Sequence, residues 1–116
     1  MTISEQLNEL ETRLKTKHVS VITHNATEVK PGKVTVLIQP PEIISEQWGE
    51  CDAKWAAAIT AGTPTTQGKA FIDILAVLDE WTASGINIIE ATPATFNLAE
   101  AGSLGCYEVT LGPMDI

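Results

Sequence analysis

Two stretches of the chain repeat their apolar residues at the spacing of an α-helix, and segments of β type separate and follow them. In residues 3–16 the repeat gives one apolar stripe, formed by Ile3, Leu7, Leu10 and Leu14. In residues 67–83 the predicted core stripe consists of Phe71, Ile74, Leu75, Leu78 and Trp81. Consecutive β segments without a helix between them imply a largely antiparallel sheet. We expect both helices to pack on one face of that sheet.

Signals at the ends of the two stretches support the helix predictions. Thr2 and Glu5 have the spacing of a capping box, in which the Thr side chain accepts a hydrogen bond from a free backbone N–H of the first turn. Ser84-Gly85 is typical of a helix C-terminus. We therefore expect the first helix to begin directly after Thr2 and the second to end before Gly85.

The remaining apolar segments are predicted as strands, over residues 18–23, 33–39, 51–61, 86–91 and 104–111. The alternation in 51–61 also fits a helix, because Cys51, Trp55 and Ile59 recur every four residues; the flanking glycines favour a strand. Pro40-Pro41 is expected to end the second strand, because proline cannot donate to a strand ladder. Residues 42–49 are then a connection, and residues 92–103 a loop.

The fold class that follows is α+β, with two helices packed on one face of a largely antiparallel sheet of four to five strands. At 116 residues, with 44% hydrophobic and 19% charged residues, the chain has the size and composition of one globular domain. We expect residues 1–116 to form that single domain, with residues 112–116 as a short tail.

The charge distribution disfavours nucleic-acid binding. The net charge is −8, and after Lys33 eleven acidic residues face two basic ones, Lys54 and Lys69. Binding to phosphates depends on clustered Lys and Arg, which this part of the chain lacks. The sequence has neither an apolar run that could span a membrane nor an N-terminal signal peptide, so folding in a cytoplasm is expected. In that compartment Cys51 and Cys106 are expected to be buried free thiols on strands.

No motif in the sequence predicts catalysis, a cofactor or a metal. Residues 62–69 resemble a phosphate-binding loop, but five residues stand between the glycines instead of four, and Ala70 follows Lys69 where Ser or Thr is needed. His18 and His24 do not have a standard metal-ligand spacing and are expected at the surface. We therefore expect a protein that is not an enzyme.

The tryptophans point to packing and to a protein interface. Trp55 and Trp81 fit core stripes, whereas Trp48 lies in the predicted connection beside Ile43 and Ile44. Exposed aromatic and aliphatic residues of this kind favour a protein interface, although a connection that folds back onto the core explains them equally well.

Taken in order, these features resemble the tail terminator (tail-completion) proteins of long, non-contractile-tailed bacteriophages. The resemblance covers nearly the whole chain and depends on the N-terminal helix, on Pro31-Gly32-Lys33-Val34 before a strand that precedes Pro40-Pro41, and on residues 48–55 (Trp-Gly-Glu-Cys-Asp-Ala-Lys-Trp). It also includes the 67–83 helix and the closing strand at 105–111 (Gly-Cys-Tyr-Glu-Val-Thr-Leu).

The resemblance implies a structural virion protein of the tail or neck, made in the host cytoplasm. Members of the family form a hexameric ring that caps the tail tube, ends its polymerisation and joins it to the head connector. The implied partners are copies of the chain itself, the tail tube protein and the head–tail connector protein, with no membrane, and DNA passes through the ring without specific binding. The candidate interface residues are Ile43, Ile44, Trp48, Phe96, Leu98, Met114 and Ile116.

An acidic ring lumen would let DNA pass without adhesion, and Glu42, Glu46 and Glu50 are the candidate lumen residues. Replacing all three with Lys should slow DNA passage, and unchanged infectivity of that triple variant would count against the idea. Two alternatives stay open: another neck subunit, such as a head-closure or connector protein, and a small cytosolic protein-binding domain unrelated to phages.

Overall fold

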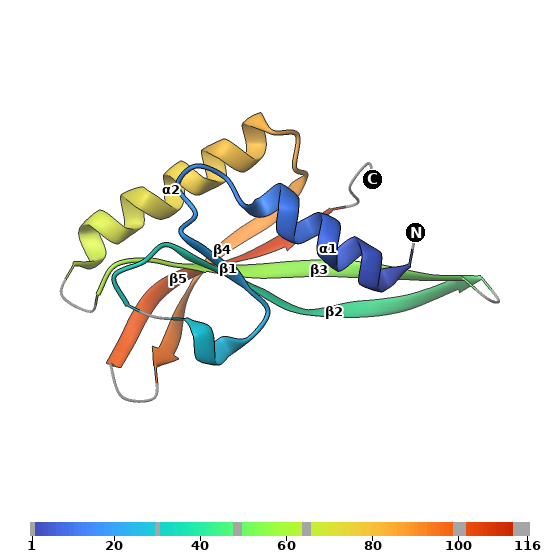
Figure 1. Ribbon diagram of the computed structural model, residues 1–116, viewed down its shortest axis with the longest axis horizontal. Helices are drawn as coiled ribbons and strands as arrows, with labels where there is room; N and C mark the ends of the chain where they lie inside the picture. Colours follow the sequence, from blue (N-terminus) through green and yellow to red (C-terminus); the bar gives the residue numbers. More distant parts are fainter. Residues whose placement is uncertain (1, 30, 48–49, 64–65, 99–101, 113–116) are drawn as a thin grey trace.

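The computed structural model of the chain describes residues 2–29, 31–47, 50–63, 66–98 and 102–112. Its elements in chain order are α1 (Ile3–Leu14), β1 (Val21–Thr23), the 3₁₀-helix η1 (Ala26–Glu28), β2 (Thr35–Gln47), β3 (Glu50–Thr60), α2 (Gln67–Ala83), β4 (Ile88–Leu98) and β5 (Gly102–Leu111). The strands form one five-stranded sheet in the order β1-β2-β3-β5-β4 (Figure 1). Only β1 runs parallel to its neighbour; the other pairs are antiparallel. The predicted α+β fold is confirmed.

The start of α1 and the end of α2 follow from local sequence signals. The Thr2 hydroxyl accepts a hydrogen bond from the Glu5 N–H at 3.1 Å, which caps the first turn of α1. At the end of α2, the Gly85 N–H donates to the Thr82 carbonyl at 3.2 Å, and the Ile86 N–H donates to the Trp81 carbonyl at 3.0 Å. This pair of bonds is a Schellman motif, and Gly85 has the positive φ of +83° that the motif requires.

The main core lies between the sheet and the two helices, which cover the same face (Figure 1). Its buried residues include Leu10 and Leu14 from α1, Val36 and Ile38 from β2, Trp55 and Ile59 from β3, Ile74, Val77 and Trp81 from α2, and Val109 and Leu111 from β5. Both core tryptophans also satisfy their indole N–H groups. Trp81 donates to the Leu14 carbonyl at 3.0 Å, and Trp55 donates to Gln6 Oε1 at 3.2 Å. A smaller cluster on the opposite face contains Val29, Leu37 and Ala58, with Phe96 against it.

One carboxylate near the end of α2 fastens the segment between α1 and β1. Glu80 Oε1 accepts hydrogen bonds from the Thr16 hydroxyl at 2.7 Å and from the His18 N–H at 3.1 Å, and Glu80 Oε2 lies 2.5 Å from His18 Nδ1. The hydrogen bond from the His18 side chain is the main reason why the pKa of Glu80 falls from 4.5 to about 2, against the opposing effect of burial. Trp81 and Glu80 together therefore tie α2 to the N-terminal part of the chain.

The prediction that Pro40-Pro41 ends the second strand is wrong. β2 continues through both prolines to Gln47, so residues 42–47 belong to a strand and not to a connection. The pairing shifts by one residue there, since Gln39 faces Ala56 and Glu42 faces Lys54. This shift is a β-bulge, which accommodates a residue that cannot take its place in the ladder. Moreover, β1 pairs with β2 only at Thr35–Leu37, so the prolines lie where β2 has become an edge strand.

The predicted loop over residues 92–103 is also wrong. β4 extends to Leu98 and β5 begins at Gly102, and their pairing runs from Ile88↔Leu111 to Leu98↔Gly102. Pro93 is tolerated inside β4 because β4 forms an edge of the sheet and one side of the strand needs no hydrogen-bonding partner. The strand predicted at 86–91 begins at Ile88 instead, because Ile86 completes the C-terminal motif of α2.

Candidate protein-interaction surfaces

A two-stranded arm extends from one end of the sheet. It consists of residues 42–47 of β2 and residues 50–55 of β3, and we call it the β2–β3 arm. β5 pairs with β3 only at Ala56–Thr60, so no third strand of the described chain supports the arm. In Figure 1 the arm continues beyond the other strands, along the longest dimension of a molecule that measures 50 × 31 × 21 Å. The base of the arm packs on the main core through Ala53 and Trp55, and the Trp55 indole N–H donates to Gln6 of α1. Two-stranded ribbons are marginally stable in water without such packing, so it is the outer part of the arm that stands to gain most from a partner.

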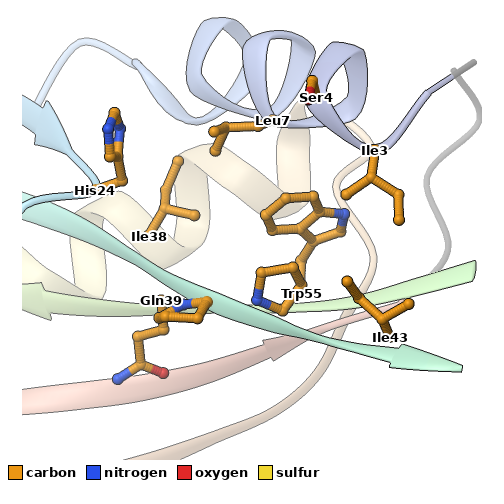
Figure 2. A pocket seen from close by; sticks show the side chains of 10 residues that line it. Ile3, Ser4, Leu7, His24, Ile38, Gln39, Ile43 and Trp55 are labelled. Atoms are coloured by element: carbon orange, nitrogen blue, oxygen red, sulfur yellow. The ribbon is translucent and has the colours of Figure 1, made fainter.

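An apolar groove lies at the base of the β2–β3 arm, between α1 and the β2 bulge. It has a volume of about 330 Å³ and is lined by Ile3, Ser4, Leu7, His24, Ile38, Gln39, Pro40, Pro41, Ile43 and Trp55. Figure 2 shows Leu7 and Ile3 reaching down from the helix toward the Trp55 ring, with Ile43 on the strand beyond it. The polar lining groups are few, and His24 is held by Glu11 at 3.2 Å. Such a lining fits an apolar side chain better than a charged ligand.

The predicted interface residues differ in position and in exposure. Ile43 lies in β2, with 55% of its surface exposed beside the groove. Ile44 lies in β2 and Leu98 in β4, but their side chains are outside the description. Phe96 lies in β4, half-buried against the small second cluster. Trp48, Met114 and Ile116 lie outside the described residues.

The three candidate lumen acids all map to the β2–β3 arm. Glu42 is exposed on β2 and pairs across the ladder with Lys54. Glu46 and Glu50 belong to β2 and β3, and their side chains are outside the description. The ladder does not bring these acids to one point, because Glu42 lies opposite Lys54 near the base of the arm, whereas Glu50 lies opposite Gln47 at its far end.

A second apolar surface, on α2, was missed by the sequence analysis. The buried stripe of α2 consists of Ala70, Ile74, Val77 and Trp81. Phe71 and Leu75, which were predicted in the core, are exposed, and so is Ile72, at 65%. Phe71 keeps one contact, with its ring centroid 6.2 Å from that of Tyr107. The sequence did contain a signal for this surface, because α2 has apolar residues on more than one side. Such a helix is expected to have more than one packing partner.

The thiol and imidazole groups that the structure describes are either buried or in contact with a glutamate. The Cys106 thiol is free and buried, and burial together with the charge of Glu108 raises its pKa, so it is a poor thiolate nucleophile. Cys51 lies in β3, with its side chain outside the description. Both histidines are exposed, as predicted, and each contacts one glutamate: His18 contacts Glu80 and His24 contacts Glu11.

Within the predicted loop-like motif at 62–69, α2 begins at Gln67, and residues 64–65 lie outside the described residues. The Thr66 hydroxyl, next to the first residue of α2, accepts a hydrogen bond from the Thr63 N–H at 2.8 Å and does not cap the helix. Within the described ranges, no three His, Cys, Asp or Glu side chains lie close enough to hold a metal ion. No helix in the described part of the chain has the length and apolar character needed to cross a membrane.

No family model, curated protein or solved structure matches the chain. The surfaces that bear on function are the β2–β3 arm with its groove and the exposed side of α2.

Proposed function

We propose that the chain is a structural virion assembly protein, a ring-forming tail terminator that caps the tail tube, ends its polymerisation and joins it to the head connector. The observation that carries this proposal is the β2–β3 arm, a two-stranded ribbon with an exposed isoleucine and an apolar groove at its base. Because such a ribbon gains stability from packing against something else, its natural partner is a neighbouring subunit.

The arrangement of the apolar surfaces suits a ring. A ring forms from a head-to-tail contact, in which each subunit offers two different surfaces and the rotation between subunits closes. The β2–β3 arm with its groove is one such surface, and among its described side chains Ile43 is a large, exposed apolar one. The receiving surface lies elsewhere on the subunit, since the arm extends away from the body of the sheet (Figure 1). A capped tube stops growing if the outer face of the ring does not offer the surface that tube subunits bind.

The test compares tails assembled with the natural protein, without it, and with an arm variant. Ile43→Asp places a charge on an exposed side chain, so the fold should persist while contacts of the arm with a neighbour are lost. Ile89→Asp is the matched control, because Ile89 on β4 is 58% exposed and Ile43 is 55% exposed.

Electron microscopy should show overlong, headless tails without the protein and with Ile43→Asp, and tails of uniform length with the natural protein and with Ile89→Asp. Normal tails in the absence of the protein would overturn the proposal. Binding of the protein to portal-bearing heads and not to isolated tail tubes would instead favour another neck subunit. A protein that stays monomeric at high concentration and has no affinity for tubes would favour a small binding domain.

A further inference from the structure

The outward side of α2 is a self-contained apolar strip with a charge near each end. At about 100° per residue, Ile72 stands opposite the buried stripe, with Ala76 on one side of it and Leu75 on the other. Lys69 precedes these residues by one turn and Asp79 follows them by one turn, and both side chains are exposed. No ion pair joins Lys69 or Asp79 to any residue that the structure describes.

Lys69 and Asp79 each lie near the end of α2 whose partial charge has the same sign as their own. The N-terminus of a helix carries partial positive charge and the C-terminus partial negative charge. Nevertheless α2 has Lys69 and no acid in its first turn, and Asp79 and Glu80 with no base near its end. Glu80 is held by Thr16 and His18, which explains its position. Asp73 lies one turn after Lys69 on the same helix, but no described residue forms an ion pair with Lys69 or with Asp79.

We propose that two copies of the chain associate through an antiparallel, two-fold contact of their α2 helices. In the register that places Lys69 opposite Asp79 of the second copy, Ile72 of one copy lies over Ala76 of the other. Leu75 then meets Leu75 of the second copy beside the two-fold axis. Each charge now lies near the end of a helix that favours it, because the second helix runs in the opposite direction. A parallel arrangement would place like charges together instead.

The contact is small, so the dimer is weak and concentration-dependent. A single helix pair buries less than the roughly 1,200 Å² of a standard stable interface. The two copies also bring together net charges of −8 each, which repel at low salt. The inference does not depend on the ring proposal: the two-fold contact uses α2, whereas the arm lies at the far end of the sheet.

Charge reversal tests the pairing without unfolding the helix. Lys69→Asp puts an acid in the first turn of α2, and Asp79→Lys puts a base near its end, so each change suits the dipole of α2. Sedimentation equilibrium over a wide concentration range, in about 0.15 M salt to limit long-range repulsion, measures association of the purified full-length protein. We expect each single variant to dimerise about tenfold or more weakly than the natural protein.

The decisive measurement mixes the two single variants. In a mixed pair, the aspartate introduced by Lys69→Asp faces the lysine introduced by Asp79→Lys. The unchanged Asp79 of the first variant faces the unchanged Lys69 of the second. Both contacts are attractive, so a heterodimer should form where neither variant dimerises alone. The double variant Lys69→Asp/Asp79→Lys should dimerise like the natural protein. Lys33→Asp and Glu90→Lys, which change exposed charges outside α2, are the matched controls and should leave association unchanged.

Ile72→Ser tests the apolar part of the same contact. Because Ile72 is 65% exposed, the change should leave the melting temperature unaltered while weakening the dimer, and Ile89→Ser should have no effect on association. A natural protein that sediments as a monomer at every concentration would overturn the proposal. So would mixed variants that fail to form a heterodimer. Either result is independent of the tail-assembly experiment, which measures tail length.

Discussion

At the scale of single residues, two neighbours at the end of α2 connect the halves of the chain. Trp81 fills the core and donates to the Leu14 carbonyl, whereas Glu80 accepts two hydrogen bonds from the segment between α1 and β1 and contacts the His18 ring. A buried indole that finds an acceptor contributes apolar burial without leaving an unpaired polar group. Trp81 and Glu80 therefore both hold the end of α2 against the chain that follows α1, Trp81 through packing and Glu80 through its charge.

The Glu80 contact predicts a dependence of stability on pH. Because the pKa of Glu80 is lowered from 4.5 to about 2 in the folded protein, the contact stabilises the fold fully above pH 4.5 and loses its effect as the pH falls toward 2. Glu80→Gln should therefore lower the free energy of unfolding by about 1 kcal/mol at neutral pH, a modest value because the contact lies near the surface. Urea unfolding at several pH values measures this.

The two proteins should become equally stable as the pH approaches 2. Glu90→Gln is the matched control, because the Glu90 side chain is exposed on β4 and takes no part in the Glu80 contact. A difference between the natural protein and Glu80→Gln that stays constant from pH 7 to pH 2 would show that the lost stability does not come from the carboxylate charge.

At the scale of elements, the start and end of each helix depend on a few backbone conformations. The Schellman motif after α2 needs a residue with positive φ, which Gly85 supplies at +83°, and the surroundings of Gly85 hold no atom within 4 Å of an added Cβ. Gly62 differs, because a Cβ there would come within 2.8 Å of the Ala70 Cβ. Gly85 is thus constrained by conformation alone, and Gly62 by conformation and by packing.

Alanine at three glycines should separate these effects. Gly85→Ala should lower the free energy of unfolding by about 1 kcal/mol through the cost of positive φ. Gly62→Ala should cost more, because the clash adds to the strain. Gly68→Ala, in the first turn of α2 with open space around it, should raise stability by about 0.5 kcal/mol. Thermal unfolding of the three variants tests this order, and a Gly85→Ala protein as stable as Gly68→Ala would contradict the C-terminal motif.

At the scale of the whole molecule, stability is unevenly distributed along the sheet. β3 is central where it pairs with both β2 and β5, over Ala56–Thr60, and belongs to a two-stranded ribbon before that. Backbone hydrogen bonds in a supported sheet open mainly when the protein unfolds, whereas those in an unsupported ribbon open locally. The arm proposed to contact a neighbour is thus the part of the sheet with least support from its own subunit.

Hydrogen exchange should reveal this contrast within one strand. Amides of residues 50–52 should exchange much faster than those of residues 57–59 in the dissociated subunit, because residues 57–59 lie between two strands, whereas residues 50–52 pair with β2 alone among the described strands. If the proposed ring forms on tail tubes, exchange in the β2–β3 arm should slow there toward the values of the central part. Equal protection along β3 in the dissociated subunit would show that the arm is stable without a partner.

The sequence by itself determined the two helices, the start of the first, the end of the second and the central strand; the first helix ends at Leu14, two residues before the end of the predicted stretch. Periodicity, the Thr2 cap and the Gly85 stop are local properties, so they act the same way whatever surrounds them. The strand preference at 51–61 was also correct, since β3 covers Glu50–Thr60. The shared helix-covered face followed from the same patterns, because both helices carry an apolar stripe that must be buried on the sheet.

The tertiary structure alone decided how far the strands extend and which side of α2 stays exposed. β2 passes Pro40-Pro41 and β4 passes Pro93 because these strands lie at edges, and a position in a sheet depends on distant segments of the chain. Phe71 and Leu75 stay exposed because the sheet can cover only one side of a helix, and local periodicity does not say which side. The β2–β3 arm could not be predicted for the same reason: it exists because β5 pairs with β3 only over Ala56–Thr60, and that pairing depends on a distant segment of the chain.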